Sequence, residues 1–344
     1  MSFFRVVLTA GLIGLLAACG GGGSSSGGTG ALSLNVTDTP VSDADISAVW
    51  LRFTDVVVKP DGNGSQPITI PVNDNLGHDY IDIDLKSLTD GKTATLLGQH
   101  MLPAGHYSWI RLVIDPDPAN TYVVETGGSV SLLDCSSCDE SHLKLVRSFA
   151  IDQGGVRAFT IDFDLRKSIT RTDSQTVPTP DYAYKLRPTL RIVDTALAGN
   201  FSGAVAESLI AANASVDTAT LTDGGSTGCS VYVFDGSGVT PDDMDFSDNG
   251  VLGGHTNPVA IADVTKVGAG GGAYSYLYTA AFLPAGDYTA AFTCDRGNDD
   301  PLIDEANISD NDPGTPEVIF LGQQDVPVEA GLATENVDFP TTAP

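Results

Sequence analysis

Apolar and polar residues alternate in short runs over most of the chain after residue 30. The runs at 32–36, 46–59, 81–86 and 159–166 repeat every second residue, and the last of them is the clearest. This period is typical of a β-strand that buries one face and exposes the other, as strands of antiparallel sheets do. Helical periodicity is nearly absent, and only residues 87–97 are predicted to form a short helix. The pattern therefore predicts an all-β protein built from antiparallel sheets.

The first residues carry the features of a cleaved export signal. One cation, Arg5, precedes an apolar run at 6–18, which is shorter than the roughly 20 residues that a membrane-spanning helix needs. The run ends in Leu-Ala-Ala-Cys at 16–19, which resembles the lipobox of bacterial lipoproteins. This resemblance implies that residues 1–18 are removed and that Cys19 becomes an acylated first residue. The alternative is an ordinary secretory signal cut near Ala18, which would leave Cys19 unmodified.

Residues 19–30 are predicted to link the lipid to the folded protein. After Cys19 this segment consists of Gly, Ser and one Thr, which supply no side chains for packing and predict a flexible tether. Gly20 follows the cysteine, where lipoproteins retained at the inner membrane carry Asp. The resemblance therefore implies acyl chains in the outer membrane of a Gram-negative-type bacterium, with the protein on its periplasmic or cell-surface face.

Acidic residues strongly outnumber basic ones: Asp+Glu total 44 and Lys+Arg total 17, for a formal net charge of -27. Such a surface repels nucleic acid and anionic lipid headgroups, so we expect no nucleic-acid partner and membrane contact only through the lipid anchor. Seven basic residues of the first half are predicted to form cross-strand ion pairs, with a basic groove for an anionic ligand as the alternative. They are Arg111, Lys144, Arg147, Arg166, Lys167, Arg187 and Arg191.

Five cysteines become one lipidation site and an even set of four, which suits an exported compartment where disulfides persist. Cys229 and Cys294 lie on predicted strands and are expected to form a disulfide within one domain. Cys135 and Cys138 form a C-x-x-C motif that follows a predicted strand and enters an acidic segment. A catalytic C-x-x-C needs a helix N-terminus to lower its thiol pKa, so we predict a structural disulfide here.

Other sequence patterns that resemble catalytic motifs lack the structural context that the chemistry needs. Gly224–Gly228 matches G-x-S-x-G by letters alone, because a strand and no helix is predicted to follow it. The glycine run at 268–273 opens a predicted strand and is interpreted as a hairpin, not as a dinucleotide-binding loop. The five histidines show no paired metal spacing. We therefore expect no cofactor, with calcium as the one possibility left open.

Acidic loops could supply the oxygen ligands that calcium requires. Asp295, Asp299, Asp300 and Asp304 are the weak candidates in the most acidic loop. No loop completes the EF-hand pattern, so a solvated acidic loop is the competing interpretation.

Several longer stretches of the first half occur in an order that resembles one known family. They are Asp-Thr-Pro at 38–40 and the segments 102–112, 143–149, 159–168 and 186–191. Together they resemble the bacterial lipoprotein family called domain of unknown function 4382, over about residues 31–196. The resemblance implies a β-rich fold and an envelope location, but no reaction and no site residues.

A short motif joins the two halves of the chain. Leu-Pro-Ala-Gly-His-Tyr at 102–107 recurs as Leu-Pro-Ala-Gly-Asp-Tyr at 283–288, each time before an alternating run. Pro and Gly favour a turn, which feeds a strand whose Tyr is expected to cap the core. This hairpin resembles that of the prealbumin-like, carboxypeptidase-regulatory-like β-sandwich modules, where it is structural. The resemblance implies a second β-sandwich, of immunoglobulin-like or prealbumin-like topology, over 197–344.

No nucleophile with a base, metal triad or cofactor loop remains in a suitable context, so we expect no enzymatic activity. The predicted role is a non-catalytic structural, adhesive or ligand-binding one at the cell envelope, with an unidentified protein or glycan as ligand. One alternative is an envelope enzyme that acts on polysaccharide through the paired carboxylates Asp162 and Asp164, which share one strand face. A calcium-stabilised surface module is the other.

Overall fold

The computed structural model describes residues 27–39, 46–74, 76–136, 138, 143–145, 147–171, 182–212, 216, 218–219, 221–244, 257–270, 273–299 and 318–340. Cys19, the signal segment and the calcium candidates Asp300 and Asp304 lie outside these residues. Within the described part of the chain, no helix is long and apolar enough to cross a membrane.

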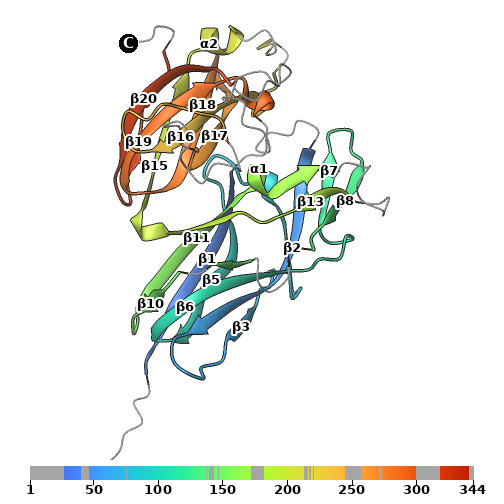
Figure 1. Cartoon of the computed structure of the whole chain (residues 1–344), viewed down its shortest axis with the longest axis vertical. Helices are drawn as coiled ribbons and strands as arrows, with labels where there is room; N and C mark the ends of the chain where they lie inside the picture. The colour runs from blue at the N-terminus through green and yellow to red at the C-terminus, as the bar shows by residue number, and fades with distance from the viewer. Residues whose placement is uncertain are drawn as a thin grey trace, which may run out of the picture.

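The chain forms two β-rich units, with the N-terminal half below and the C-terminal half above in Figure 1. The first unit contains a four-stranded and a ten-stranded sheet. The smaller sheet has the order β14 (Leu190–Asp194), β11 (Val156–Asp164), β1 (Thr29–Thr39), β5 (Ala94–Pro103). The larger sheet follows the path β10 (Phe149–Ile151), β6 (Gly105–Ile114), β2 (Ile46–Pro60), β7 (Tyr122–Glu125), β8 (Val130–Asp134), β13 (Tyr182–Leu186), β12 (Ile169–Arg171). Three further strands pair beside this path: β3 (Ile68–Pro71) and β4 (Ile81–Asp84) with β2, and β9 (Lys144–Leu145) with β6.

The two sheets of the first unit share one hydrophobic core. Leu32, Leu34 and Val36 of β1 are completely buried, as their alternation with polar residues predicts. Phe53 of β2 packs edge-on against Phe163 of β11, with ring centroids 6.0 Å apart. These contacts confirm the predicted all-β, sandwich-like class.

Two details of the first unit differ from the sequence-based predictions. β1 pairs in parallel with β11, whereas antiparallel sheets were expected. Residues 87–97 form no α-helix: the 3-10 helix η1 (Leu85–Ser87) ends there, a turn follows, and β5 begins at Ala94. Asp90 and Gly91 stop any helix because both have positive φ, at 60° and 77°.

The second unit contains one seven-stranded sheet. Its order is β20 (Phe320–Val328), β19 (Gly286–Thr293), β16 (Ser226–Asp235), β17 (Ala260–Gly270), β18 (Ala273–Pro284), β15 (Ala198–Val205), β21 (Ala333–Thr334). Phe339 packs on Tyr278 of β18 and Phe292 of β19, at centroid distances of 5.9 and 5.8 Å. The C-terminal segment thereby covers the core of this sheet. A short helix, α2 (Glu207–Ala211), follows β15.

The repeated Leu-Pro-Ala-Gly turn has the same structure in both units. Tyr107 and Tyr288 are buried, and each phenolic hydroxyl donates to the carbonyl oxygen of the proline four residues earlier, Pro103 or Pro284, at 2.7 Å. Both turns connect strands that are consecutive in the sequence but are not paired with each other, β5 with β6 and β18 with β19. The expectation that the tyrosine caps the core is confirmed.

Candidate functional site

A buried ion pair joins the two units. Arg166 lies in α1 (Leu165–Ser168), a single helical turn that Asp164 caps by accepting from the Lys167 amide at 3.2 Å. Leu165 packs into the first core, and the adjacent Arg166 reaches the second unit, where it pairs with the Asp299 carboxylate. Neither side chain has any exposed surface. Two residues far apart in the sequence therefore meet in a contact that excludes water.

The Asp299 carboxylate has several further partners in the second unit. The hydroxyl of Tyr232 in β16 donates to one carboxylate oxygen, and the Met244 amide donates to the other at 3.3 Å. Arg166 also donates to the Asp299 carbonyl oxygen at 2.8 Å and lies 5.4 Å from the centroid of the Tyr232 ring. This arrangement satisfies a charge that would be costly to bury alone.

Burial and neighbouring groups shift the pKa values of Arg166 and Tyr232 at this contact. Burial alone would lower the pKa of Arg166, but the interactions with Tyr232 and Asp299 outweigh it and raise that pKa. Burial also raises the pKa of the Tyr232 hydroxyl. The guanidinium therefore stays charged and the phenol stays neutral at ordinary pH.

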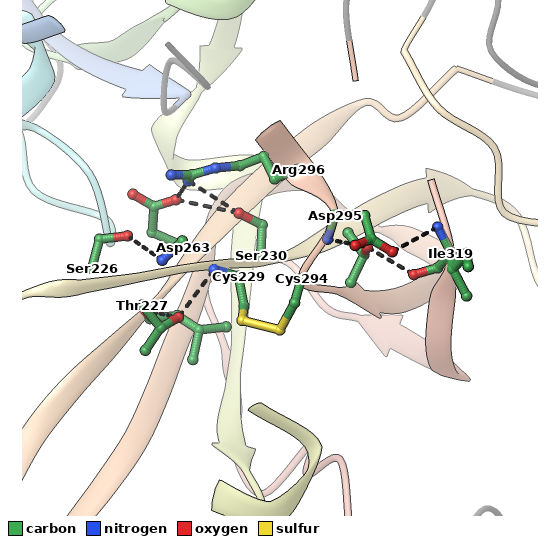
Figure 2. The surroundings of a disulfide bond; sticks show 12 residues. Ser226, Thr227, Cys229, Ser230, Asp263, Cys294, Asp295, Arg296 and Ile319 are labelled. Carbon is green, nitrogen blue, oxygen red and sulfur yellow. Dashed lines mark hydrogen bonds and ion pairs between the residues drawn. A yellow bond between two sulfur atoms is a disulfide. The ribbon is translucent and has the colours of Figure 1, made fainter. Parts of the chain in front are cut away.

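A second arginine lies beside this pair, in η3 (Arg296–Asn298). Arg296 pairs with Asp263 of β17 and donates to the Ser230 hydroxyl at 3.1 Å (Figure 2). Burial, and then repulsion from Arg166, lower the pKa of Arg296 to about 10. Figure 2 also shows the Cys229–Cys294 disulfide, which joins β16 to the residue after β19 next to Arg296. Covalent and ionic links therefore fix the wall of the second unit that faces the first.

A groove runs between the two units. One cavity of about 480 Å³ is lined from the first unit by Ser47, Lys86, Thr89, Asp90 and Lys92. From the second unit it is lined by Gly224, Ser226, Asp263, Thr265, Val267, Leu277, Tyr278 and Thr279. An adjoining cavity of about 350 Å³ shares Asp90 and Thr279 and extends to Gly331. Each volume lies within the range of about 300–1,000 Å³ that is typical of small-molecule sites.

The turn at Asp90 and Gly91 brings the first unit against the second. Both residues have positive φ, and the Lys92 amide donates to the Thr89 carbonyl oxygen at 3.2 Å, which closes the turn. A Cβ added to Gly91 would lie 3.1 Å from the Cβ of Ala281 in β18, so glycine permits this close approach. Burial raises the pKa of Asp90, while Lys92, Thr89 and Thr265 act against that shift.

Both predicted disulfides are present. Cys135 pairs with Cys138 after β8, and Cys229 pairs with Cys294. The C-x-x-C segment follows a strand, as expected for a structural bridge. The segment that matches G-x-S-x-G begins in a turn at Gly224 and continues into β16, which starts at Ser226; Gly224 and Gly228 both have positive φ.

The described carboxylates of the calcium and enzyme hypotheses, Asp295, Asp299, Asp162 and Asp164, make contacts with other residues of the protein. Of the calcium candidates, Asp299 holds Arg166, and Asp295 accepts from the Ile319 amide at 3.2 Å. Among the described residues, no group of three or more His, Cys, Asp or Glu side chains is arranged to hold a metal ion. Asp162 pairs with Arg191 on the neighbouring strand at 2.7 Å, which is one of the predicted cross-strand ion pairs, and Asp164 caps α1.

The groove itself was not predicted. The Asp-Gly pair at 90–91 could have indicated the turn in its wall, because this dipeptide favours tight turns in which both residues have positive φ. The contact of that turn with β18, almost 190 residues later, has no signal in the hydrophobic pattern. Arg166 was grouped with six other basic residues, and nothing in its spacing distinguishes a buried interface arginine from a surface one.

One comparison with known proteins concerns the first unit. Residues 29–188 match the family model "Domain of unknown function (DUF4382)". The match supports the predicted domain of this family in the first half of the chain and ends just before β14. No curated protein matches the chain.

Solved structures give only remote likenesses. A leucine-rich repeat protein from Bacteroides thetaiotaomicron is 11% identical, with a TM-score of 0.18 over 91% of this chain and 26% of its own. The Bacillus anthracis TIE protein is also 11% identical, with a TM-score of 0.17 over 89% of this chain and 33% of its own. A protein described as a candidate cell adhesion protein, from Bacteroides fragilis, is 10% identical, with a TM-score of 0.19 over 91% and 94%. This chain thus spans about a quarter and a third of the length of the first two.

Proposed function

We propose that this protein is a lipid-anchored envelope protein of the bacterial outer membrane with a non-catalytic, ligand-binding role. Cys19 carries the acyl chains, and the Gly/Ser tether separates the two β-rich units from the membrane. The groove between the units is the binding site. The observation that carries this proposal is a groove of ligand size whose two walls are joined by the buried Arg166–Asp299 pair.

The groups around the groove favour binding over catalysis. Asp263 is paired with Arg296, and Asp90 belongs to a closed turn at the contact between the units. Asp162 and Asp164, the carboxylates of the enzymatic alternative, do not line either cavity. Ser and Thr hydroxyls instead make up much of the lining and suit hydrogen bonding to a polar ligand.

The binding role is tested with two arginine substitutions at matched positions. Leu277 lines the groove and is 40% exposed, while Leu321 of β20 lies outside it and is 38% exposed. The purified mature protein is titrated calorimetrically with neutral, anionic and cationic oligosaccharides and with extended peptides. We expect at least one probe to bind, Leu277→Arg to abolish its binding, and Leu321→Arg to leave it unchanged. If no probe binds, or if both variants behave alike, the groove is not the site.

The anchor is tested separately by mass spectrometry of the protein isolated from membranes. We expect an N-terminal peptide that begins at Cys19 and carries acyl chains, and we expect Cys19→Ser to release the protein from the membrane fraction. An unmodified thiol at Cys19, or an uncleaved leader, would contradict the lipoprotein assignment. Protease treatment of intact cells then distinguishes the cell-surface face from the periplasmic face.

A further inference from the structure

The groove is elongated and follows one strand. Leu277, Thr279 and Ala281 alternate along the outward face of β18 and line the two cavities in succession. From Leu277 to Ala281 the strand advances about 13 Å, at roughly 3.3 Å per residue. Thr279 and Asp90 line both cavities, so the two spaces adjoin at these side chains. The site therefore suits an extended chain better than one compact ring.

The charges that line the groove balance each other. Lys86 and Lys92 come from the first unit, and the carboxylates are Asp90 and Asp263. The balanced lining therefore favours neither a cationic nor an anionic ligand, and the net charge of -27 repels an anionic polymer before it arrives. These charges fit a neutral ligand best.

Asp90 presents a half-buried carboxyl group where the two cavities adjoin. Its Oδ2 atom accepts from the Thr89 hydroxyl at 3.4 Å, and Thr265 interacts with the same carboxyl group. A hydroxyl group can both donate and accept, so it matches Asp90 whether the carboxyl is ionised or protonated.

Backbone strain occurs on both walls of the groove. Asp90 has φ 60° and Phe282 of β18 has φ 55°, and both line the smaller cavity. Asp tolerates this conformation, but for a bulky residue such as Phe it is a genuine outlier. Phe282 lies where the register of β18 with β15 shifts, as at a β-bulge. Strained residues and bulges are over-represented at binding sites, which is consistent with a groove shaped for a ligand.

We propose that the groove binds a neutral oligosaccharide in an extended conformation. Asp90, Thr279 and Lys92 hydrogen-bond to its hydroxyl groups, and Leu277 packs against the apolar face of a sugar ring. This inference rests on the proposed function and names the ligand class for the same site.

The test measures binding of neutral and charged probes to the full mature chain. The neutral probes are cello-, malto-, manno- and N-acetylchito-oligosaccharides; the charged probes are oligogalacturonate and chitosan oligosaccharide; an extended peptide completes the set. At least one neutral probe should bind more tightly than any charged probe or peptide. Thr279→Val, which removes one hydroxyl at nearly constant volume, should weaken that binding about fivefold.

One control makes the test specific. Thr69→Val changes an exposed strand threonine on β3, outside the groove, and should leave binding of the neutral probe unchanged.

The possible outcomes separate the two proposals. Tighter binding of a charged probe or a peptide, lost in Leu277→Arg, would overturn the oligosaccharide inference and leave the binding role intact. Binding of a neutral probe that Thr279→Val leaves unchanged would also overturn it. If no probe binds, both proposals fail.

Discussion

Asp38 is a buried carboxylate of the first unit. It follows the buried Leu32, Leu34 and Val36 on the inward face of β1, and among the described residues no well-formed hydrogen bond reaches either of its carboxylate oxygens. Burial first, and then repulsion from Asp162 and Asp164, raise its pKa well above the ordinary value, against weaker effects of the Leu165 amide and Lys86. The folded state therefore binds the Asp38 proton more tightly than the unfolded state does. The stability this proton contributes is fully present below the unfolded pKa of about 3.9 and is lost as the pH rises through the folded value.

Asp38→Asn should therefore stabilise the protein at pH 8 by about 1–3 kcal/mol, because it removes a buried charge while keeping the shape of the side chain. The gain should shrink as the pH falls toward 4, where Asp38 itself is protonated. Urea unfolding of both proteins at a series of pH values measures the difference. The exposed Asp79→Asn serves as control and should change stability little at any pH. A destabilised Asp38→Asn at pH 8 would contradict this account.

The two turn tyrosines allow the same hydrogen bond to be removed in each unit. Tyr107→Phe and Tyr288→Phe should each reduce the free energy of unfolding by about 1 kcal/mol, since one buried hydrogen bond is lost and the ring remains. Chemical denaturation provides the measurement. Tyr122→Phe, a partly exposed strand position, is the comparison and should have a smaller effect. Equal losses at all three positions would argue against a special role for the turn.

At the level of elements, the hydrophobic pattern predicts where strands occur but not how they pair. The period of two residues locates β1, β2 and β11 well, because each strand has one face in a core. A parallel strand with one buried face has the same period, so the parallel pairing of β1 with β11 leaves no mark in the pattern. The helix predicted at 87–97 fails because a turn at Asp90 and Gly91, which docks on the second unit, interrupts it.

The long-range disulfide is expected to stabilise the second unit. The Cys229–Cys294 bridge closes a loop of 65 residues, and the chain-entropy model assigns about 4 kcal/mol to such a loop. Replacing both cysteines by serine should destabilise the second unit and thereby lower the melting temperature of the whole protein. The same replacement of Cys135 and Cys138, which are three residues apart, should have a much smaller effect. Calorimetry of the two double variants makes the comparison, and similar losses would contradict the prediction.

At the level of the whole molecule, the candidate site exists only because the two units meet. Sequence reasoning predicted two β-rich halves and both disulfides, since these depend on local periodicity and on cysteine number. It could not predict the groove, whose walls come from a turn near residue 90 and from strands between residues 226 and 279. The contact between the units depends on the shapes of two folded surfaces and on one buried pair, Arg166 with Asp299.

Breaking this pair should separate the units. Arg166→Met leaves Asp299 as a buried, uncompensated carboxylate, which should cost about 3–5 kcal/mol. The double variant Arg166→Met with Asp299→Asn should recover part of that loss, because the charge is then also removed. Lys167→Met, at a partly exposed neighbouring position that pairs with Asp164, is the control and should change stability by less than about 1 kcal/mol. Urea unfolding of these four proteins and of the single variant Asp299→Asn gives the coupling energy of the pair.

Differential scanning calorimetry of the unmodified mature protein and of Arg166→Met tests most directly whether the two units form one body with a groove between them. We predict a single cooperative transition for the unmodified protein, with equal calorimetric and van't Hoff enthalpies. We predict two separate transitions for Arg166→Met. Two independent transitions in the unmodified protein, or one unchanged transition in the variant, would contradict the account.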